Sequence, residues 1–381
     1  MYIFLEIKNM SKNILILGSG MVGCLIAVEL HKNHKVTVID ASSENLKSLD
    51  SYEDIKKIHR RVNFDDMSEL EIDKYDLIVG ALPGSIGFKT AQKVLGLGKN
   101  YIDISFFPED PLQLDALAKE KNVVFIPDIG VAPGLSNLVA ANYAYNHSIN
   151  FFKCMVGGLP KTRNWPFEYK APFSPLDVIE EYIRPARIKR NGKEVVFDPL
   201  TEIENFDVKN IGTLECFLSD GLRTLLHTLD IENMEEKTVR YPGYAQKIQM
   251  FKSLGFFDEQ KIEVDGQSIT PREFTSKLLF ENWKLGENEE EFTYMRIDMH
   301  SDKKKFQFEL YDDTKDGFSS MSRTTGYTCT AVAEAFLSGK IKPDAGVVPP
   351  EYLVKDKSAY AFILNYLSNK DIKIHVTETE L

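Results

Sequence analysis

The sequence predicts an α/β protein: a doubly wound parallel sheet, joined to a second α+β domain whose sheet is largely antiparallel. Three observations support this prediction. Up to Pro133, short apolar runs alternate with helical stretches, and a glycine-rich turn follows the first run. Beyond Pro133 the pattern changes to proline-rich loops and to segments that alternate apolar with polar residues. The length of 381 residues suits two domains.

In the first part of the chain, apolar runs of strand length are separated by helices. The runs lie at residues 13–17, 34–39, 75–81, 101–105 and 123–126, and the helical stretches include 25–30, 88–97 and 112–121. Parallel strands need a long crossover connection, usually a helix. The alternation therefore predicts βαβ units and a parallel sheet.

The second part carries the signals of paired antiparallel strands. A hairpin is expected over 187–197, with Asn191-Gly192 at its turn. Residues 291–299 and 305–311 alternate as two further paired strands would. After them, 324–338 predicts a helix that packs back on the first domain.

These patterns set the expected domain boundaries. The first domain should span 12–133, completed by 322–350; the second should span 134–321; and a C-terminal segment, 351–381, should pack on the first. An exposed sheet in the second domain would suit a homodimer.

Composition narrows the possible partners and compartments. The chain has 46 Lys and Arg against 57 Asp and Glu, a formal charge of −11, which argues against a nucleic-acid or anionic-membrane partner. Glu6 and Lys8 interrupt the first apolar stretch, so we expect neither a signal peptide nor a membrane anchor. Four scattered cysteines without a CxxC pair favour a cytoplasmic location, and the seven histidines show no metal-ligand spacing.

The glycine-rich turn at 18–23 has the form GxGxxG, between a strand and a helix. In a Rossmann fold the three glycines permit a tight turn, a close approach to a pyrophosphate and close packing of helix on strand. The pyrophosphate would lie on the free N–H groups of the helix N-terminus. Packing alone is the alternative explanation. The first cofactor-binding candidates are therefore Gly18, Ser19, Gly20, Met21, Val22 and Gly23.

Asp40 ends the second strand, about 20 residues further on, where an acid binds the ribose hydroxyls of the adenosine half. A 2′-phosphate there would meet a carboxylate, and unit charges about 4 Å apart repel by about 4 kcal/mol at an effective dielectric of 20. No arginine follows until Arg60, so NAD is preferred over NADP. Ser42, Ser43 and Lys47 would still allow a phosphate if Asp40 turned away.

The carboxyl ends of the later strands supply the remaining candidates around the nicotinamide half. The cofactor-binding set is Ala81, Leu82, Pro83, Ile104, Ser105 and Gly130, and the candidate catalytic residues are Lys89, Asp103 and Asp128. For the two aspartates, a helix cap or a local loop hydrogen bond is the alternative role. Lys89 is otherwise a surface lysine.

Several motifs resemble the saccharopine dehydrogenase-like superfamily, especially its lysine 6-dehydrogenase branch. They lie at 80–84 (GALPG), 101–108 (YIDISFFP), 127–137 (PDIGVAPGLSN), 156–160 (VGGLP), 219–223 (SDGLR), 239–243 (VRYPG) and 320–326 (SMSRTTG). The resemblance extends from about residue 12 to about residue 370.

The resemblance implies NAD-dependent oxidation of the ε-amine of L-lysine, with release of ammonia. The product would be 2-aminoadipate 6-semialdehyde, which cyclises to a piperideine carboxylate. Saccharopine reductase typically has an acid before the proline of the loop 130–134, so Ala132 favours the lysine enzyme. Asn63-Phe64-Asp65 departs from the usual turn against the adenine, and Asp65 is our candidate there. The alternatives are a saccharopine or carboxynorspermidine-type dehydrogenase, or a non-catalytic NAD sensor.

The chemistry requires a neutral amine, although a lysine ammonium has a pKa of about 10.4 and its neutralisation at pH 7 costs about 4–5 kcal/mol. A base or an apolar pocket must therefore assist, and we expect an alkaline optimum. Arg223 and Arg240 are predicted to bind the substrate carboxylate, with pairing to acids of their own domain as the alternative.

The second domain supplies the other substrate-binding candidates. Gly157 and Gly158 would bring backbone close to the ligand, unless they only form a turn. Tyr169 lies in a proline-flanked loop that would line the pocket or act as a lid, with a plain surface loop as the alternative. Asp220 or Glu215 is a candidate for the α-ammonium.

Overall fold

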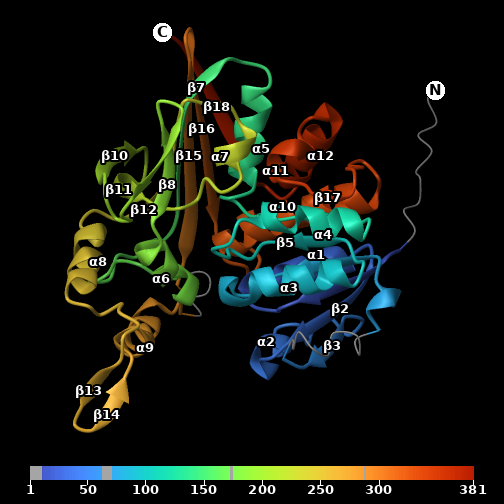
Figure 1. Ribbon diagram of the computed structural model, residues 1–381, viewed down its shortest axis with the longest axis horizontal. Coiled ribbons are helices and arrows are strands. Elements are labelled where there is room, and N and C mark those ends of the chain that lie inside the picture. Colours follow the sequence, from blue (N-terminus) through green and yellow to red (C-terminus); the bar gives the residue numbers. More distant parts are fainter. Residues whose placement is uncertain (1–10, 62–70, 172–174, 287–288) are drawn as a thin grey trace.

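The computed structural model describes residues 11–61, 71–171, 175–286 and 289–381. Two sheets stand side by side, with helices packed between and around them (Figure 1). The first is a parallel sheet of seven strands in the order β17-β6-β5-β4-β1-β2-β3. Its order reverses between β1 and β4, which makes it the predicted doubly wound sheet. The fold class is confirmed.

The strands and helices of the first sheet follow the apolar runs of the sequence. Its strands are β1 (Asn13–Leu17), β2 (Lys35–Asp40), β3 (Lys56–His59), β4 (Leu77–Gly80), β5 (Tyr101–Asp103), β6 (Val124–Ile126) and β17 (Gly346–Val347). The helices and 3-10 turns around it are α1 (Met21–His31), α2 (Ser43–Lys47), η2 (Ile72–Lys74), α3 (Gly84–Gly96), η3 (Pro111–Leu114), α4 (Asp115–Glu120), α5 (Leu135–Ala144), α10 (Ser320–Leu337), α11 (Pro350–Leu353) and α12 (Lys357–Ser368). β3 carries two lysines and a histidine in four residues, so no apolar run marked it.

The second sheet has nine strands, and β7 pairing with β12 is its parallel step. The strands are β7 (Ile149–Pro160), β8 (Ala186–Arg190), β9 (Lys193–Phe197), β10 (Glu204–Val208), β11 (Gly212–Leu218), β12 (Asn233–Arg240), β15 (Glu291–Ser301), β16 (Lys304–Asp313) and β18 (Ile374–Glu380). The predicted hairpin and the predicted pair β15–β16 are both present.

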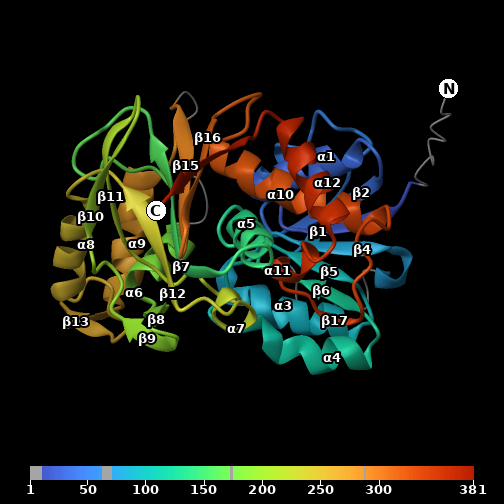
Figure 2. The ribbon, with the colours of Figure 1, turned by 90° about the horizontal axis from the view of Figure 1, so that it is seen from above.

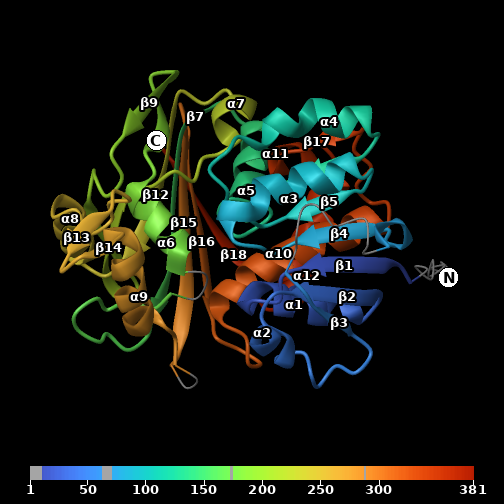
Figure 3. The same ribbon diagram turned by 60° about the horizontal axis from the view of Figure 1, so that its bottom comes forward.

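Smaller elements complete the second domain: α6 (Pro175–Ile183), α7 (Leu225–Thr228), α8 (Tyr244–Ser253), α9 (Pro271–Trp283) and the hairpin β13 (Ile262–Val264) and β14 (Gln267–Ile269). The hairpin and α9 lie on the outer side of this domain, away from the first sheet (Figure 1 and Figure 3).

The two domains share one apolar core. It runs from the β1 and α1 side chains through α5 and α10 to the inner face of β15 and β16, and Figure 2 shows α5 and α10 between the two sheets. Gly326 lets α10 approach α1 closely, because a Cβ there would lie 2.7 Å from Leu25 Cδ2. A second core, on the other face of the first sheet, contains residues of α3 and α4.

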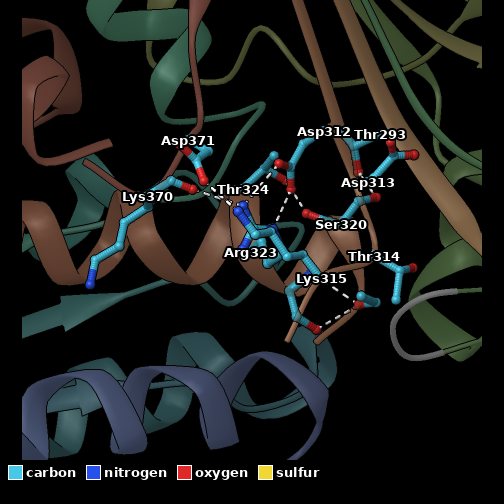
Figure 4. A network of polar contacts seen from close by, with 12 residues as sticks. Thr293, Asp312, Asp313, Thr314, Lys315, Ser320, Arg323, Thr324, Lys370 and Asp371 are labelled. Carbon is cyan, nitrogen blue, oxygen red and sulfur yellow. Dashed lines mark hydrogen bonds and ion pairs between the residues drawn. The ribbon is translucent and has the colours of Figure 1, made fainter. Parts of the chain in front are cut away.

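A polar cluster fixes the start of α10 to the second sheet (Figure 4). Arg323 donates to both carboxylate oxygens of Asp312 on β16, at 2.8 and 3.1 Å, and to the Lys370 carbonyl at 2.8 Å. Both side chains of the pair are almost fully buried. α10 is therefore held by the second sheet at its beginning and by α1 further along.

The C-terminal segment differs from its expected position. α12 packs on α10, but β18 pairs with β16 at the edge of the second sheet. Our expectation that all of 351–381 packs on the first domain is wrong for this strand. The physical reason is that β16 would otherwise expose a row of unpaired N–H and C=O groups.

Within the described residues, no helix combines the length and apolar character that a membrane crossing needs.

Candidate active site

A cavity of about 1040 Å³ lies between the two domains. Its walls come from the glycine-rich turn after β1, from the ends of β2, β4, β5 and β6, and from β7, β12 and α6 of the second domain. This volume lies at the upper end of the roughly 300–1,000 Å³ of ligand pockets. The cavity can therefore hold an elongated ligand together with a smaller one.

The glycine-rich turn forms a cradle that side chains would fill. Gly18 has φ +99°, and a Cβ there would lie 2.3 Å from the Ala81 carbonyl oxygen. A Cβ at Gly23 would lie 2.3 Å from the Gly18 carbonyl oxygen, whereas nothing lies within 4 Å of a Cβ at Gly20. Gly18 and Gly23 thus serve turn and packing, and Gly20 leaves open space at the start of α1. These residues fit the pyrophosphate of a dinucleotide.

Asp40 and Arg61 mark the adenosine end of the cavity. Asp40 accepts hydrogen bonds from the Ser19 N–H at 2.6 Å and the Ser42 N–H at 2.7 Å. Ser19 is itself buried, so its side chain supports Asp40 from behind the wall. Arg61 reaches this end because β3 runs parallel to β2, with the Arg60 N–H bonded to the Asp40 carbonyl. Asp65 lies outside the described residues.

Most of the predicted nicotinamide contacts line the same cavity. Besides Gly18, Gly20 and Gly23, the wall includes the predicted residues Met21, Val22, Asp40, Ala81, Leu82, Pro83, Ile104, Ser105, Gly130 and Asp128. The strand ends therefore meet at one edge, as the parallel order requires.

The three predicted catalytic residues have different positions. Asp103 is completely buried behind the wall, where it accepts hydrogen bonds from the Ser105 N–H at 3.0 Å and hydroxyl at 2.8 Å. Burial raises the pKa of Asp103 to about 7, against the lowering effect of these bonds. Lys89 is exposed on α3 and is absent from the cavity wall, so it does not fit a catalytic role. Asp128 does line the cavity.

Asp128 is paired with Arg223. The Arg223 Nε donates to the Asp128 carboxylate at 3.1 and 3.3 Å, and Nη1 donates to the Phe107 carbonyl at 2.8 Å. Both residues have left-handed φ, 57° and 51°, which is uncommon outside glycine. Arg223 is not on the cavity wall. Our prediction that it binds the substrate carboxylate is therefore corrected: a buried acid already occupies it.

The other predicted substrate contacts divide in the same way. Gly157, Gly158 and Arg240 line the cavity. The Arg240 guanidinium donates to Glu181 at 3.0 Å and to the Tyr182 hydroxyl at 3.2 Å. Tyr169 is buried in the core of the second domain, and its ring centroid lies 4.3 Å from the Arg240 guanidinium carbon. The prediction that Tyr169 lies in a pocket-lining or surface loop is therefore wrong, and its ring packs against Arg240 instead.

Sequence reasoning missed Arg184 and Glu236, which both line the cavity. Arg184 follows α6 and lies over the Phe106 ring, 4.5 Å from its centroid. Glu236 is a buried acid in β12. The available signal was the run Met234-Glu235-Glu236-Lys237, in which charged side chains must point to both faces of a central strand.

Asp220 was a candidate to bind the substrate α-ammonium, and it lines the cavity. Its carboxylate already accepts hydrogen bonds from Arg187 Nε at 2.9 Å and Nη2 at 2.8 Å. Glu215 lies away from the cavity wall and accepts the N–H groups of Gly243 and Ala245 near the start of α8. Within the described ranges, no group of three or more potential ligands is arranged to hold a metal ion.

A doubly wound domain with this turn, open toward a polar second domain, defines a dinucleotide-binding protein of the two-domain type. The chain matches the family model "Saccharopine dehydrogenase NADP binding domain" over residues 14–126 and "Saccharopine dehydrogenase C-terminal domain" over residues 130–372. The chain belongs to the saccharopine dehydrogenase family.

Curated relatives and a solved structure agree with this assignment. Saccharopine dehydrogenase [NADP(+), L-glutamate-forming] of Pyricularia oryzae is 23% identical over 291 residues, 71% of this chain and 63% of the relative. Alpha-aminoadipic semialdehyde synthase of Arabidopsis thaliana is 23% identical over 251 residues, 61% of this chain and 24% of the relative. The chain thus spans less than two thirds of the length of these relatives.

The fold is similar to apo saccharopine dehydrogenase (L-Glu forming) from Saccharomyces cerevisiae, with a TM-score of 0.77 and 18% identity, over 97% of this chain and 100% of that one. This similarity shows the fold.

Proposed function

We propose that the chain is an NAD(P)-dependent dehydrogenase that takes a hydride from the amine-bearing carbon at the end of a lysine chain. The observation that carries this proposal is the single cavity that joins the glycine cradle to the polar residues of β12 and α6. A bound nicotinamide would supply the hydride acceptor at the strand ends. The chain's own residues must then hold the substrate, exclude water and remove the proton from the amine.

Two substrates share this carbon and differ in the leaving amine. Saccharopine carries glutamate on the lysine nitrogen, and the activity in the names of the curated relatives favours it as the substrate. L-Lysine would release ammonia, and the charged residues of the cavity favour L-lysine as the substrate. Of the acids and arginines at the substrate end, Arg240 is paired with Glu181, Asp220 with Arg187 and Asp128 with Arg223.

Arg240 keeps a buried Nε without a hydrogen-bond partner among the described residues, but its charge is balanced by Glu181 at 3.0 Å, whereas Arg184 has no acid that close on this part of the wall. The Arg184 Nε and Nη1 have no hydrogen-bond partner among the described residues, and its contact to Glu180 is 4.0 Å long. Burial and the nearby Arg223 lower the pKa of Arg184. A carboxylate bound here would satisfy these donors by charge-assisted hydrogen bonds. One such anchor matches lysine, which has one carboxylate, better than saccharopine, which has three.

For the cofactor, the sequence favoured NAD, whereas the names of the family model and of the relatives carry NADP. Arg61 is a candidate for the 2′-phosphate, because it lies on the cavity wall beside Asp40. We therefore propose NADP or NAD, with Arg61 as the residue that decides between them.

The experiment is reduced-nicotinamide absorbance with purified protein, each oxidised cofactor, and L-lysine or saccharopine at mildly alkaline pH. Ammonia release identifies lysine as substrate, and glutamate release identifies saccharopine. The variant Arg184→Leu should raise the substrate KM at least about tenfold, since a hydrogen bond to a charged group contributes about 1.5–3 kcal/mol. Dinucleotide binding without turnover of either compound would contradict the proposal and favour a sensor.

A further inference from the structure

Glu236 lines the end of the cavity formed by the second domain. It lies on β12, which pairs with β11 on one side and β7 on the other, and its side chain lines the cavity together with Gly221. A Cβ at Gly221 would lie 1.9 Å from Glu236 Oε2, so the glycine makes room for the carboxyl group. The position is fixed by both strand pairing and this loop.

The polar surroundings of Glu236 consist of hydroxyls and other acids. The Ser219 hydroxyl donates to Oε2 at 3.1 Å and accepts from the Thr238 hydroxyl at 2.8 Å, which gives a short chain of three cavity-lining groups. The nearby titratable groups are Glu181 on α6, Asp220 in the loop after β11 and Cys154 on β7.

Two cations of this region are already paired. Arg240, on the same strand, is bonded to Glu181, and Arg187 holds Asp220. No ion pair joins Glu236 to a cation in the described part of the chain. Unlike Asp103, which is buried behind the wall, Glu236 lines the cavity, so a cationic ligand can reach it, and charged groups are rarely buried unless they are paired. The missing charge is one that an ammonium ligand would bring.

We propose that Glu236 pairs with the substrate ammonium and accepts its proton before hydride transfer, a role that rests on the proposed function. One N–H bond of the ammonium breaks, the proton goes to a Glu236 carboxylate oxygen, and the electron pair stays on nitrogen. That pair then forms the C=N bond as the hydride leaves the adjacent carbon for the oxidised cofactor. Water subsequently hydrolyses the imine.

The environment makes Glu236 a better proton acceptor than an ordinary glutamate. Burial first, and then the charge of Glu181, raises the pKa of Glu236 from 4.5 to about 8. A raised pKa makes proton transfer from an ammonium more favourable than transfer to an unperturbed glutamate would be. An acid with pKa about 8 is mostly protonated at pH 7 in the empty cavity, so binding of an ammonium must release a proton.

Two measurements on the full chain test this role. The first is calorimetry of L-lysine and saccharopine binding to the protein loaded with reduced cofactor, which cannot accept a hydride, in buffers of different ionisation enthalpy. The wild type should release most of a proton at pH 7 and less at a pH above the raised pKa of Glu236. Glu236→Gln should bind without release. Glu235→Gln is the matched control, because its side chain points to the opposite face and pairs with Arg190 and Lys153, so it should release protons like the wild type.

The second measurement is the pH profile of kcat/KM. Glu236→Gln should lower kcat/KM by about 100-fold or more and remove the rise near pH 8, with cofactor affinity unchanged. Glu236→Asp should keep part of the rate and the rise. Wild-type rate, profile and proton release in Glu236→Gln would overturn the inference and leave the proposed function intact. Proton release that depends on Glu236, without turnover by the wild type, would support Glu236 as the ammonium partner and overturn the proposed function. A wild type that binds neither compound would overturn both.

Discussion

Replacement of Arg223 by alanine distinguishes a structural from a substrate-binding arginine. In the structure the Arg223 and Asp128 side chains are 1% and 0% exposed, and the pair is joined by bonds of 3.1 and 3.3 Å. Removal of the cation leaves a buried, unpaired carboxylate and an unsatisfied Phe107 carbonyl. Loss of one partner of such a buried pair costs about 3–5 kcal/mol. We expect the free energy of unfolding to fall by that amount.

The assay is urea denaturation of the wild type, Arg223→Ala, Asp128→Asn and the double variant. Asparagine is suited to position 128, because it tolerates the left-handed φ found there. The double variant should be more stable than the sum of the two single losses predicts, since it leaves no buried charge. An unchanged free energy of unfolding, together with a substrate KM raised tenfold or more, would refute the structural role and restore Arg223 as a substrate contact.

Three further predictions concern the cofactor site and its support. Gly18→Ala should prevent dinucleotide binding, because Gly18 has φ +99° and a Cβ there would lie 2.3 Å from the Ala81 carbonyl oxygen. Gly20→Ala should fold normally and lose about tenfold or more in cofactor affinity. Circular dichroism compares the folding of the two variants, and cofactor fluorescence compares their affinities. Arg61→Ser should weaken NADP binding by about 10–100-fold and leave NAD binding unchanged in the same titration, and equal effects would exclude a 2′-phosphate contact. Burial raises the pKa of Asp103 to about 7, so its protonated form stabilises the fold at low pH and this contribution is lost as the pH rises through 7. The fall in the free energy of unfolding between pH 5 and pH 8, measured by urea denaturation, should be smaller in Asp103→Asn than in the wild type by about 2–3 kcal/mol.

The fold was largely predictable because its strands are apolar runs bounded by turn residues. The segment 13–17 becomes β1 with its predicted bounds, and 187–197 becomes the hairpin with its turn at Asn191-Gly192. The strand β3 was not predictable in this way, because it lies at a sheet edge and has only one half-buried apolar residue, Ile58. The strand β18 was not predicted either, because nearly all of its residues are exposed.

The cofactor side of the site was predictable because the parallel order places every strand end at one edge. The substrate side depends on long-range pairing that no local pattern specifies. The sequence offered no means to distinguish Arg223 from Arg240 as the carboxylate-binding residue. The structure shows that Arg223 lies behind the wall and pairs with Asp128, whereas Arg240 lines the cavity. Glu236 was not selected, because the burial that gives it an unusual pKa comes from the loop at Gly221 and from α6.

The return of the chain to the first sheet has a consequence for biosynthesis. β17 covers the β6 edge, and α10 covers the apolar face of α1, yet both elements lie beyond residue 319. A nascent chain that has emerged only as far as β16 therefore exposes an open strand edge and an uncovered helix face, and both features favour aggregation. The dinucleotide domain can therefore close only after the chain has been made through β17, which follows the second domain in the sequence. Expression of this protein should therefore depend on chaperones that bind apolar segments until residue 347 has been made.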